Sequence, residues 1–353
     1  MNRYCVIMAG GIGSRFWPLS KNNYPKQFLD ILGTGKSFIR ATFERFNPIV
    51  PAENFIVVTN AAYKQLVLEQ LPELKEDQVL CEPMRRNTAP CIAYAIYHIL
   101  SKDMEASVAV TPADHLVTNE IEFQRVIRQG LEFVEQKRDA LMTIGIQPSR
   151  PETGYGYIEV GPEFDVQSPE KGIVPVVSFK EKPDLETAKQ FVSAGRFFWN
   201  SGIFLWSTDA IMKALREYLP DLVRLFDEGK PFFGTPEEQA FINRQFEKCE
   251  NISIDYGVME RSKSRYTVAA DFGWSDIGTW GSLFAHAAKD ECNNAISGKA
   301  ITVDTKDSVV NIESGYEAIV EGLDHCLVAL RDHSLLVCRL QDEQEIKKWV
   351  EKL

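Results

Sequence analysis

A glycine-rich turn interrupts the chain directly after its first apolar run. The run Tyr4 to Met8 predicts a buried strand, and it leads into the stretch AGGIGSR, residues 9–15. Glycines at such a turn let the backbone bend tightly and let its N–H groups approach an anion. Arg15 and Lys26 both precede the first acid of the chain, Asp30. The pattern therefore predicts an anion-binding loop in a basic part of the sequence, although a structural turn with surface cations would look similar.

Two common phosphate-binding motifs do not fit this region. A dinucleotide fingerprint needs G-x-G-x-x-G, but Phe16 stands where the third glycine should allow close helix packing. A Walker A loop ends in G-K-[ST], which residues 35–37 supply, yet Asp30 occupies the position of its first glycine. An aspartate there would face phosphate oxygens, so we reject both motifs.

Two isolated aspartates are candidates for holding a metal ion. Asp114 directly follows the apolar run that ends in VTPA, and Asp276 lies in the aromatic loop FGWSDIGTW. Magnesium prefers one or two carboxylates together with substrate phosphate oxygens. The two residues would form one Mg²⁺ site if the fold brings them together, and the alternative for Asp114 is a turn-forming role.

Further polar residues stand at the ends of predicted strands and helices. Glu82 precedes a helix start at which Asn87 or Thr88 serves as the cap. A carboxylate there can accept from the N–H edge of a purine, and the alternative is an ordinary cap with two solvated arginines. Glu181 and Asn200 supply a carboxylate and an amide suited to sugar hydroxyls, although either alone is common in loops.

The elements that must position these residues alternate between strand and helix. This alternation predicts an α/β, Rossmann-like fold, with a mixed, mostly parallel sheet and helices on both faces. Ligands of such sheets bind beyond the carboxyl ends of the strands. The expected strands are Cys5–Met8, Phe55–Val58, Ser107–Thr111 and Ala140–Ile144, and the expected helices are Ala61–Leu71, Pro90–Leu100 and Glu122–Gln136.

The C-terminal part of the chain has a different pattern. Short β-rich pieces separated by Gly and Asp begin near residue 295, and a helical segment, Glu343–Leu353, follows them. We expect a catalytic region over residues 1–285 and a small β-rich, β-helix-like domain over residues 286–353. The expected strands of the tail are Ala300–Val303, Ser308–Ile312, Ala318–Val320, Cys326–Leu330 and Ser334–Arg339.

Composition excludes several classes of function. The chain has 353 residues and a net charge of −11, so it lacks the basic footprint of a nucleic-acid-binding protein. No stretch of about 18 apolar residues predicts a membrane span. The seven cysteines are scattered without a CxxC pair, which is typical of free thiols in a reducing cytoplasm.

Six segments together resemble the signatures of the sugar-1-phosphate nucleotidyltransferases, and the resemblance covers residues 1–285. Trp17 and the run RNTAP point to the guanylyl, mannose-using branch of that family. The segments, in order, are GGIGSRFWP (10–18), PKQF (25–28), EP with RNTAP (82–90), FKEKP (179–183), NSGIF (200–204) and GWSDIG (273–278).

The resemblance implies transfer of GMP from GTP to mannose 1-phosphate, giving GDP-mannose and pyrophosphate. It implies Arg15 and Lys26 as catalytic groups and Mg²⁺ as the cofactor, held by Asp114 and Asp276. The implied binding residues fall into three sets: Gly10, Gly11, Gly13 and Ser14 for the GTP phosphates; Glu82, Asn87 and Thr88 for guanine; and Gly156, Glu181, Lys182 and Asn200 for the sugar phosphate.

Other functions stay open from the sequence. The same chemistry on another sugar 1-phosphate or nucleotide is one, a catalytically silent nucleotide-sugar sensor is a second, and a nicotinamide-dependent dehydrogenase, weakened by Phe16, is a third. We expect GTP and mannose 1-phosphate as partners, neither nucleic acid nor membrane, and leave a homodimer open. The tail is too short for the isomerase domain of longer bacterial relatives, and its three histidines lack a metal-site pattern.

Overall fold

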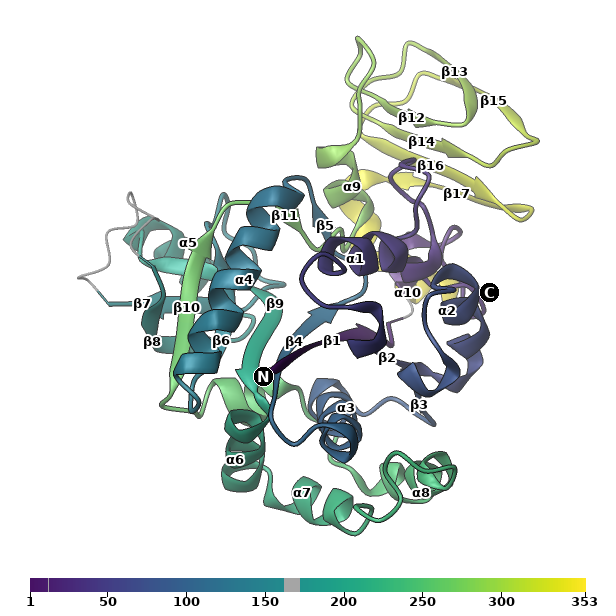
Figure 1. Cartoon of the computed structure of the whole chain (residues 1–353). Coiled ribbons are helices and arrows are strands. Elements are labelled where there is room, and N and C mark those ends of the chain that lie inside the picture. The colour runs from purple at the N-terminus through teal and green to yellow at the C-terminus, as the bar shows by residue number, and fades with distance from the viewer. Residues whose placement is uncertain (12, 162–171) are drawn as a thin grey trace. The chain divides into compact units, whose positions relative to one another are not determined.

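The computed structural model describes residues 1–11, 13–161 and 172–353, and Figure 1 shows its elements. Contacts divide the chain into two compact units. The first unit comprises Met1–Gly10, Thr42–Ala113 and Val117–Trp274, and the second comprises Gly11–Ala41, Asp114–Leu116 and Ser275–Leu353. From Gly11 onward, the glycine turn therefore belongs to the same unit as the C-terminal part of the chain.

A nine-stranded sheet forms the centre of the first unit. The strands β8 and β9 run antiparallel to their neighbours, and the other seven share one direction, so the prediction of a mixed, mostly parallel sheet is confirmed. In sheet order the strands are β3 (Val79–Glu82), β2 (Phe55–Asn60), β1 (Asn2–Ala9), β4 (Ala106–Pro112), β9 (Phe197–Ser207), β6 (Leu141–Ile146), β10 (Arg265–Ala270), β8 (Val174–Lys180) and β7 (Tyr157–Val160).

Helices alternate with these strands along the chain. Their bounds are α1 (Phe38–Phe46), α2 (Lys64–Gln70), α3 (Thr88–Lys102), α4 (Glu120–Gln136), α5 (Leu185–Ala194), α6 (Thr208–Tyr218), α7 (Pro220–Asp227) and α8 (Glu238–Gln245), with the short strands β5 (Leu116–Val117) and β11 (Trp274–Ser275). Of the two residues expected to cap α3, Asn87 is the cap. Asp184 caps α5 by accepting from the Thr187 N–H at 2.8 Å.

Both faces of the sheet carry helices, as expected. Phe204 and Trp206 on β9 join one core with α3 and α6. Leu205 lies between them in the strand and meets α4 instead, where a Cβ built at Gly130 would collide with its side chain. Because successive strand residues point to opposite faces, α4 covers the face opposite to α3 and α6.

Two strands that carry candidate site residues were not among the expected elements. The edge strand β3 holds Glu82 at its end, and β9 runs for 11 residues through the polar pair Asn200 and Ser201. Polar residues and Gly202 in the middle of that stretch indicated a loop. Burial of the large aromatic residues on either side keeps the whole segment extended.

The second unit contains the β-rich tail. Lys299 pairs in parallel with Glu317 and Val309 pairs in parallel with Leu327, so both pairings join residues eighteen positions apart. Successive coils of the chain therefore stack in register. The elements are α9 (Trp280–His286), β12 (Ala295–Ser297), β13 (Lys299–Val303), β14 (Val309–Ile312), β15 (Glu317–Glu321), β16 (Cys326–Arg331), β17 (Ser334–Arg339) and α10 (Ile346–Val350).

The end of the chain is less helical than the sequence predicted. The expected helix Glu343–Leu353 begins as the 3-10 segment Leu340–Glu345, and only α10 is α-helical. Ile346 is fully buried in one core with Phe16 and Trp280, so packing on one residue orders this short helix. The boundary at residue 285 stays a prediction.

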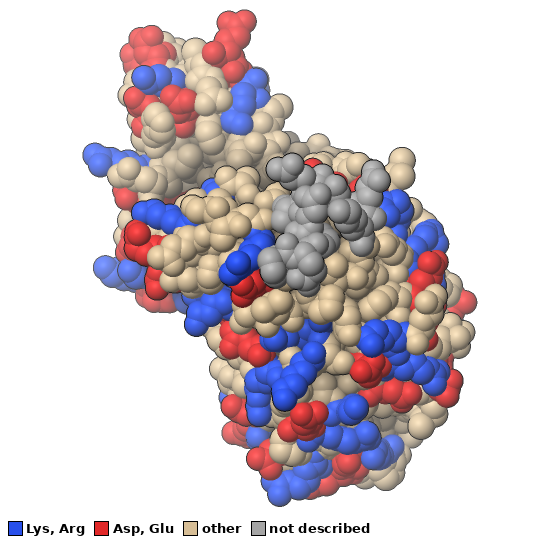
Figure 2. Space-filling view, turned by 90° about the vertical axis from the view of Figure 1, so that its left-hand side faces the viewer, with Lys and Arg blue, Asp and Glu red and all other residues tan. Residues whose placement is uncertain are grey.

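Acidic and basic side chains are interspersed on the face shown in Figure 2. Across the described part of the chain, no helix combines the length and the apolar character that crossing a membrane requires.

Candidate active site

Lys26 lies at the centre of a polar cluster in the second unit. Its Nζ donates to Asp114 Oδ2 at 2.9 Å, to the Asp114 backbone oxygen at 3.1 Å and to the Asp276 backbone oxygen at 2.8 Å. Its side chain is only 4% exposed. One ammonium group thus holds together two aspartates that are 162 positions apart in the chain (114 and 276).

Gly13 makes room for this lysine. It has a φ of +66°, and a Cβ built on it would lie 2.5 Å from Lys26 Cβ and 3.2 Å from Ser20 Oγ. Gly11 contributes its backbone oxygen, which accepts from Gln27 Nε2 at 3.1 Å. The glycine turn is therefore required by close packing against residues 20–27, in addition to any approach of an anion.

Asp114 is an ionised carboxylate at neutral pH. Burial alone would raise its pKa, but the charges of Lys26 and His115 and the hydrogen bond from Lys26 outweigh burial, so the pKa is lowered. The side chain remains 35% exposed, which leaves it accessible to a ligand.

The loop that carries Asp276 has an unusual backbone. Ile277 has a φ of +41°, a rare conformation for a β-branched residue, and its side chain is fully buried. The Gly278 N–H donates to Asp276 Oδ1 at 3.0 Å, and a Cβ on Gly278 would lie 2.8 Å from the same carboxylate. Burial of Ile277 and the absence of a side chain at 278 thus fix the position of Asp276.

The donor set of Asp114 and Asp276 fits Mg²⁺. Both offer hard carboxylate oxygens, and Lys26 holds both residues around one ammonium group. Magnesium sites built from two carboxylates are completed by substrate phosphates and water.

Arg15 stands on the 3-10 turn Ser14–Phe16 in the same unit. Phe16 is fully buried against Trp280, with ring centroids 5.3 Å apart, whereas Arg15 is exposed. The buried ring anchors the turn and leaves the guanidinium group and the half-buried Ser14 available to a ligand.

The proposed guanine residues lie in the first unit, where the parallel strands β1, β2 and β3 end at one edge. Glu82 is 7% exposed, and its Oε1 has no hydrogen-bond partner. Burial raises the pKa of Glu82 to about 8, against a hydrogen bond from Cys91 and the charge of Arg85, which lower it. A Cβ built on Gly10 would lie 3.8 Å from Glu82 Oε2, so the turn after β1 passes this carboxyl.

Asn87, the cap of α3, is held in a backbone conformation that is essentially restricted to glycine. Its φ is +66° and its ψ is −168°. Its side chain accepts from the Thr88 N–H at 3.0 Å, and Thr88 Oγ1 accepts from the Ile254 N–H at 2.9 Å. Strain of this kind persists only where surrounding contacts impose it, and it gathers at binding sites.

The proposed sugar residues also come together in the first unit. The Gly156 backbone oxygen accepts from the Asn200 N–H at 2.8 Å, and a Cβ on Gly156 would collide with the Glu181 carboxylate. Burial raises the pKa of Glu181, although Lys182 Nζ lies 3.2 Å from its Oε1 and opposes the shift. Lys182 itself has a φ of +45°. The side chains of Glu181 and Asn200 thus both lie against Gly156, where a side chain would displace the Glu181 carboxylate.

Comparison with known proteins identifies the family of this chain. A sequence model of the nucleotidyl transferase family matches residues 4–293. The chain belongs to the nucleotidyl transferase family. The mannose-1-phosphate guanylyltransferase of Escherichia coli strain K12 is 36% identical over 99% of this chain and 73% of its own length. ManC, the corresponding enzyme of Salmonella typhimurium, is also 36% identical, with the same coverage.

Solved structures show the same likeness for this nucleotidyl transferase. A crystal structure from Thermus thermophilus, described as a mannose-1-phosphate geranyltransferase, superposes with a TM-score of 0.87 at 28% identity. The match covers 100% of this chain and 99% of that one.

Two polar residues beside Asn200 were not predicted from the sequence of this nucleotidyl transferase. The Asn200 Nδ2 donates to Asp255 Oδ1 at 3.0 Å, and its Oδ1 accepts from Thr143 Oγ1 at 2.7 Å. Burial and the charge of Glu181 raise the pKa of Asp255 to about 7. An isolated acid beside the apolar Ile254 was the available signal, and it is the same signal that singled out Asp114.

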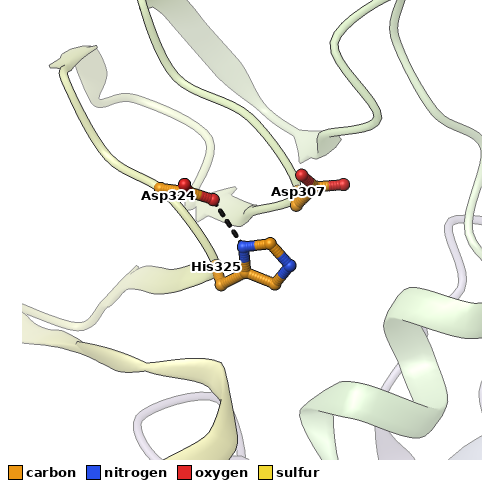
Figure 3. Close-up of side chains that lie close together, drawn as sticks. All are labelled: Asp307, Asp324 and His325. Atoms are coloured by element: carbon orange, nitrogen blue, oxygen red, sulfur yellow. Dashed lines mark hydrogen bonds and ion pairs between the residues drawn. The ribbon is translucent and has the colours of Figure 1, made fainter.

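The β-rich part of the nucleotidyl transferase also holds a small group of metal-binding residue types. Figure 3 shows Asp307, Asp324 and His325, whose ligand atoms lie within 4.8 Å of one another. His325 hydrogen-bonds Asp324, and Asp307 accepts from Asn293 Nδ2 at 2.7 Å. Asp324 also pairs with Lys306 at 3.4 Å. These contacts belong to the turns of the β coils, and we assign the group no metal.

Proposed function

We propose that this nucleotidyl transferase transfers GMP from GTP to mannose 1-phosphate, releasing pyrophosphate and forming GDP-mannose. The observation that carries the proposal is the buried Lys26 ammonium, which holds Asp114 and Asp276 together beside the Gly13 turn. An ammonium group, two carboxylates that can hold a metal ion and the backbone N–H groups of a glycine turn together suit a triphosphate. The likeness to mannose-1-phosphate guanylyltransferases supports the choice of substrates.

The reaction is an in-line displacement. A phosphate oxygen of the sugar phosphate forms a bond to the α-phosphorus of GTP while the bond to the pyrophosphate oxygen breaks. The attacking phosphate is already ionised, so no side chain has to remove a proton. Catalysis then depends on bringing two polyanions together and on stabilising the negative charge that develops.

The candidate site residues of the second unit would bind the phosphates and stabilise this negative charge. Gly11, Gly13 and Ser14 would present backbone N–H groups to the phosphates, and Arg15 and Lys26 would offset charge as pyrophosphate leaves. Asp114 and Asp276 would hold Mg²⁺, which supplies Lewis-acid stabilisation of the phosphate oxygens when bound.

Residues of the first unit would select the substrates. The unpartnered Oε1 of Glu82 is a ready acceptor for the N–H groups of guanine, and Asn87 and Thr88 would line the same subsite. Gly10 would contact the phosphates. Gly156, Glu181, Lys182 and Asn200 would bind the sugar phosphate. Asp255 and Thr143 would act as positioning residues, because they hold the two ends of the Asn200 amide.

The stacked coils of the tail would form a short β-helix, supported by the parallel pairings of Lys299 with Glu317 and of Val309 with Leu327, each eighteen positions apart. A catalytic region over residues 1–285, followed by a small domain over residues 286–353, is supported by a family match that covers residues 4–293. All seven cysteines are free thiols, in keeping with a cytoplasmic enzyme. A homodimer stays a prediction.

The experiment that tests this function measures pyrophosphate release with Mg²⁺. GTP, ATP, UTP and dTTP are each combined with mannose 1-phosphate and with glucose 1-phosphate. We expect release with GTP and mannose 1-phosphate. Release with a different pair would keep the chemistry and overturn the substrates, and GDP-mannose binding without any release would favour a nucleotide-sugar sensor.

A further inference from the structure

An acid from the C-terminal end of the chain reaches the segment that follows the Asp276 loop. Glu343, on the 3-10 segment Leu340–Glu345, accepts through Oε2 from the Gly281 N–H at 2.6 Å. Gly281 is in the first turn of α9, which begins four residues after Asp276. The carboxylate therefore fixes the helix start to which the Asp276 loop is joined.

The positive charge of Arg15 also acts on the Glu343 carboxylate. Burial raises the pKa of Glu343, whereas the hydrogen bonds from Gly281 and Thr279 and the positive charge of Arg15 lower it. The packing around it is continuous, since Phe16, Trp280 and Ile346 are all fully buried in one core of the second unit. One acid thus contacts the start of α9 and lies within the electrostatic influence of Arg15.

We propose that Glu343 is a positioning residue that fixes the Asp276 loop through Gly281 and holds Arg15 electrostatically until GTP phosphates bind. This inference rests on the proposed function, and it gives the C-terminal segment a part in nucleotide and magnesium binding. If Glu343 served only as a helix cap, replacing it would change the stability of the fold but not the binding of GTP or Mg²⁺.

Gly281 also explains why the carboxylate can come so close. A Cβ built on Gly281 would lie 3.0 Å from Glu343 Oε1, which is too short for an undisturbed contact. An alanine there would displace the carboxylate while leaving its charge in place. The contact can therefore be disturbed independently by a substitution of Glu343 or by a substitution of Gly281.

The test compares Glu343→Ala and Glu343→Gln with a matched control, Glu345→Ala. Glu345 lies on the same 3-10 segment, but it pairs with Lys348 at 2.9 Å and is 46% exposed. For each variant we would measure kcat, the KM for GTP, the KM for mannose 1-phosphate, the half-saturating Mg²⁺ concentration and Tm. The separation of the two KM values distinguishes positioning from a general loss of structure.

We expect Glu343→Ala to raise the GTP KM and the Mg²⁺ requirement by about tenfold, the usual scale for losing a hydrogen bond to a charged group. The KM for mannose 1-phosphate should stay within about twofold. Glu343→Gln keeps an acceptor for Gly281 but removes the charge that faces Arg15. It should therefore keep the Mg²⁺ requirement near that of the wild type and bind GTP more tightly.

Equal changes in both KM values, or a Glu343→Ala variant that matches Glu345→Ala, would overturn the proposal. Should Glu343→Ala fail to fold, Gly281→Ala tests the same contact, and an unchanged Mg²⁺ requirement there would count against it. Calorimetry of GTP with Mg²⁺ on the same variants needs no turnover. A wild type that binds GTP but releases no pyrophosphate would refute the proposed function, while the variants would still test the role of Glu343.

Discussion

Glu82 shows how burial of a single carboxyl makes the stability of the protein depend on pH. Its carboxyl is buried at the end of β3 with one oxygen unpartnered, and burial raises its pKa to about 8. The folded protein therefore keeps a proton on Glu82 between pH 4.5 and 8, where the unfolded chain has released it. Stability from this group is present at low pH and is lost as the pH rises toward 8.

Glu82→Gln should accordingly stabilise the protein at alkaline pH. The amide cannot acquire the buried charge. At about pH 9 we therefore expect the free energy of unfolding to exceed that of the wild type by an amount on the order of 1–3 kcal/mol, and Tm to be higher. At about pH 5 the two proteins should have similar Tm values. Thermal unfolding at both pH values checks this, with the exposed Glu53→Gln as control. An equal Tm change at the two pH values would contradict the assigned ionisation.

The same variant should weaken the choice of base. A glutamine still accepts one hydrogen bond from guanine, but it can also donate to adenine. The ratio of kcat/KM for GTP over ATP should fall by about tenfold, since one imperfect hydrogen-bond pairing costs about 1–2 kcal/mol. An unchanged ratio would place guanine recognition elsewhere.

Arg15→Ala tests the second of the two proposed catalytic groups. The guanidinium is exposed on a turn whose fold depends on the buried Phe16, so the variant should keep the wild-type Tm. Turnover should fall on the order of 10²–10³, as for loss of one group that stabilises a developing anion. Arg339→Ala, also an exposed arginine of the second unit, is the control. Near-normal turnover in a folded Arg15→Ala protein would remove this residue from the mechanism.

At the scale of elements, sequence patterns predicted what depends on local chemistry. Apolar runs predicted β1, β2, β4 and β6, and a capping residue predicted the start of α3. The strand β9 was missed because its extension past Asn200 and Gly202 depends on pairing with β4 and β6. Asp255 was missed because its importance comes from contact with Asn200, which is 55 positions away (200 and 255).

The glycine turn has a cause that its sequence did not reveal. Glycines indicated close approach to an anion, whereas the structure also places Lys26 against Gly13. Asp30, which excluded a Walker A loop, instead accepts from the N–H groups of Thr34 and Gly35 at 2.9 and 2.7 Å. The Asp30 carboxylate thus occupies backbone N–H groups of the kind that bind phosphate in a Walker A loop.

Gly13→Ala should therefore act through Lys26. The positive φ costs a non-glycine residue about 1–2 kcal/mol, and the new Cβ would press on the lysine. We expect turnover to fall by about 10²-fold because Lys26 can no longer hold Asp114 and Asp276 together. Gly33→Ala is the matched control, since Gly33 has a φ of +69° with nothing within 4 Å of its Cβ position. Equal loss of activity in both variants would attribute the effect to backbone strain alone.

For the whole molecule, sequence composition marked where the β-rich tail begins but not what it packs against. Phe16 and Trp280 share a core with Val309, Leu327 and Ile346 of the tail. Local periodicity contains no information on such a contact, because Phe16 and its partners lie hundreds of positions apart. The compact unit that holds the catalytic turn consequently includes the C-terminal part of the chain.

A chain that ends at residue 285 should therefore lose more than an appendage. It would expose Phe16 and Trp280, whose burial contributes about 2–3 kcal/mol each, and so release the turn that carries Arg15. We expect this truncated chain to lose measurable GTP binding by calorimetry and to exchange the amide hydrogens of residues 13–41 rapidly. A chain that ends at Val350 is the control, since the three residues it lacks are exposed. Wild-type GTP affinity in the chain of residues 1–285 would show that the catalytic region is complete without the tail.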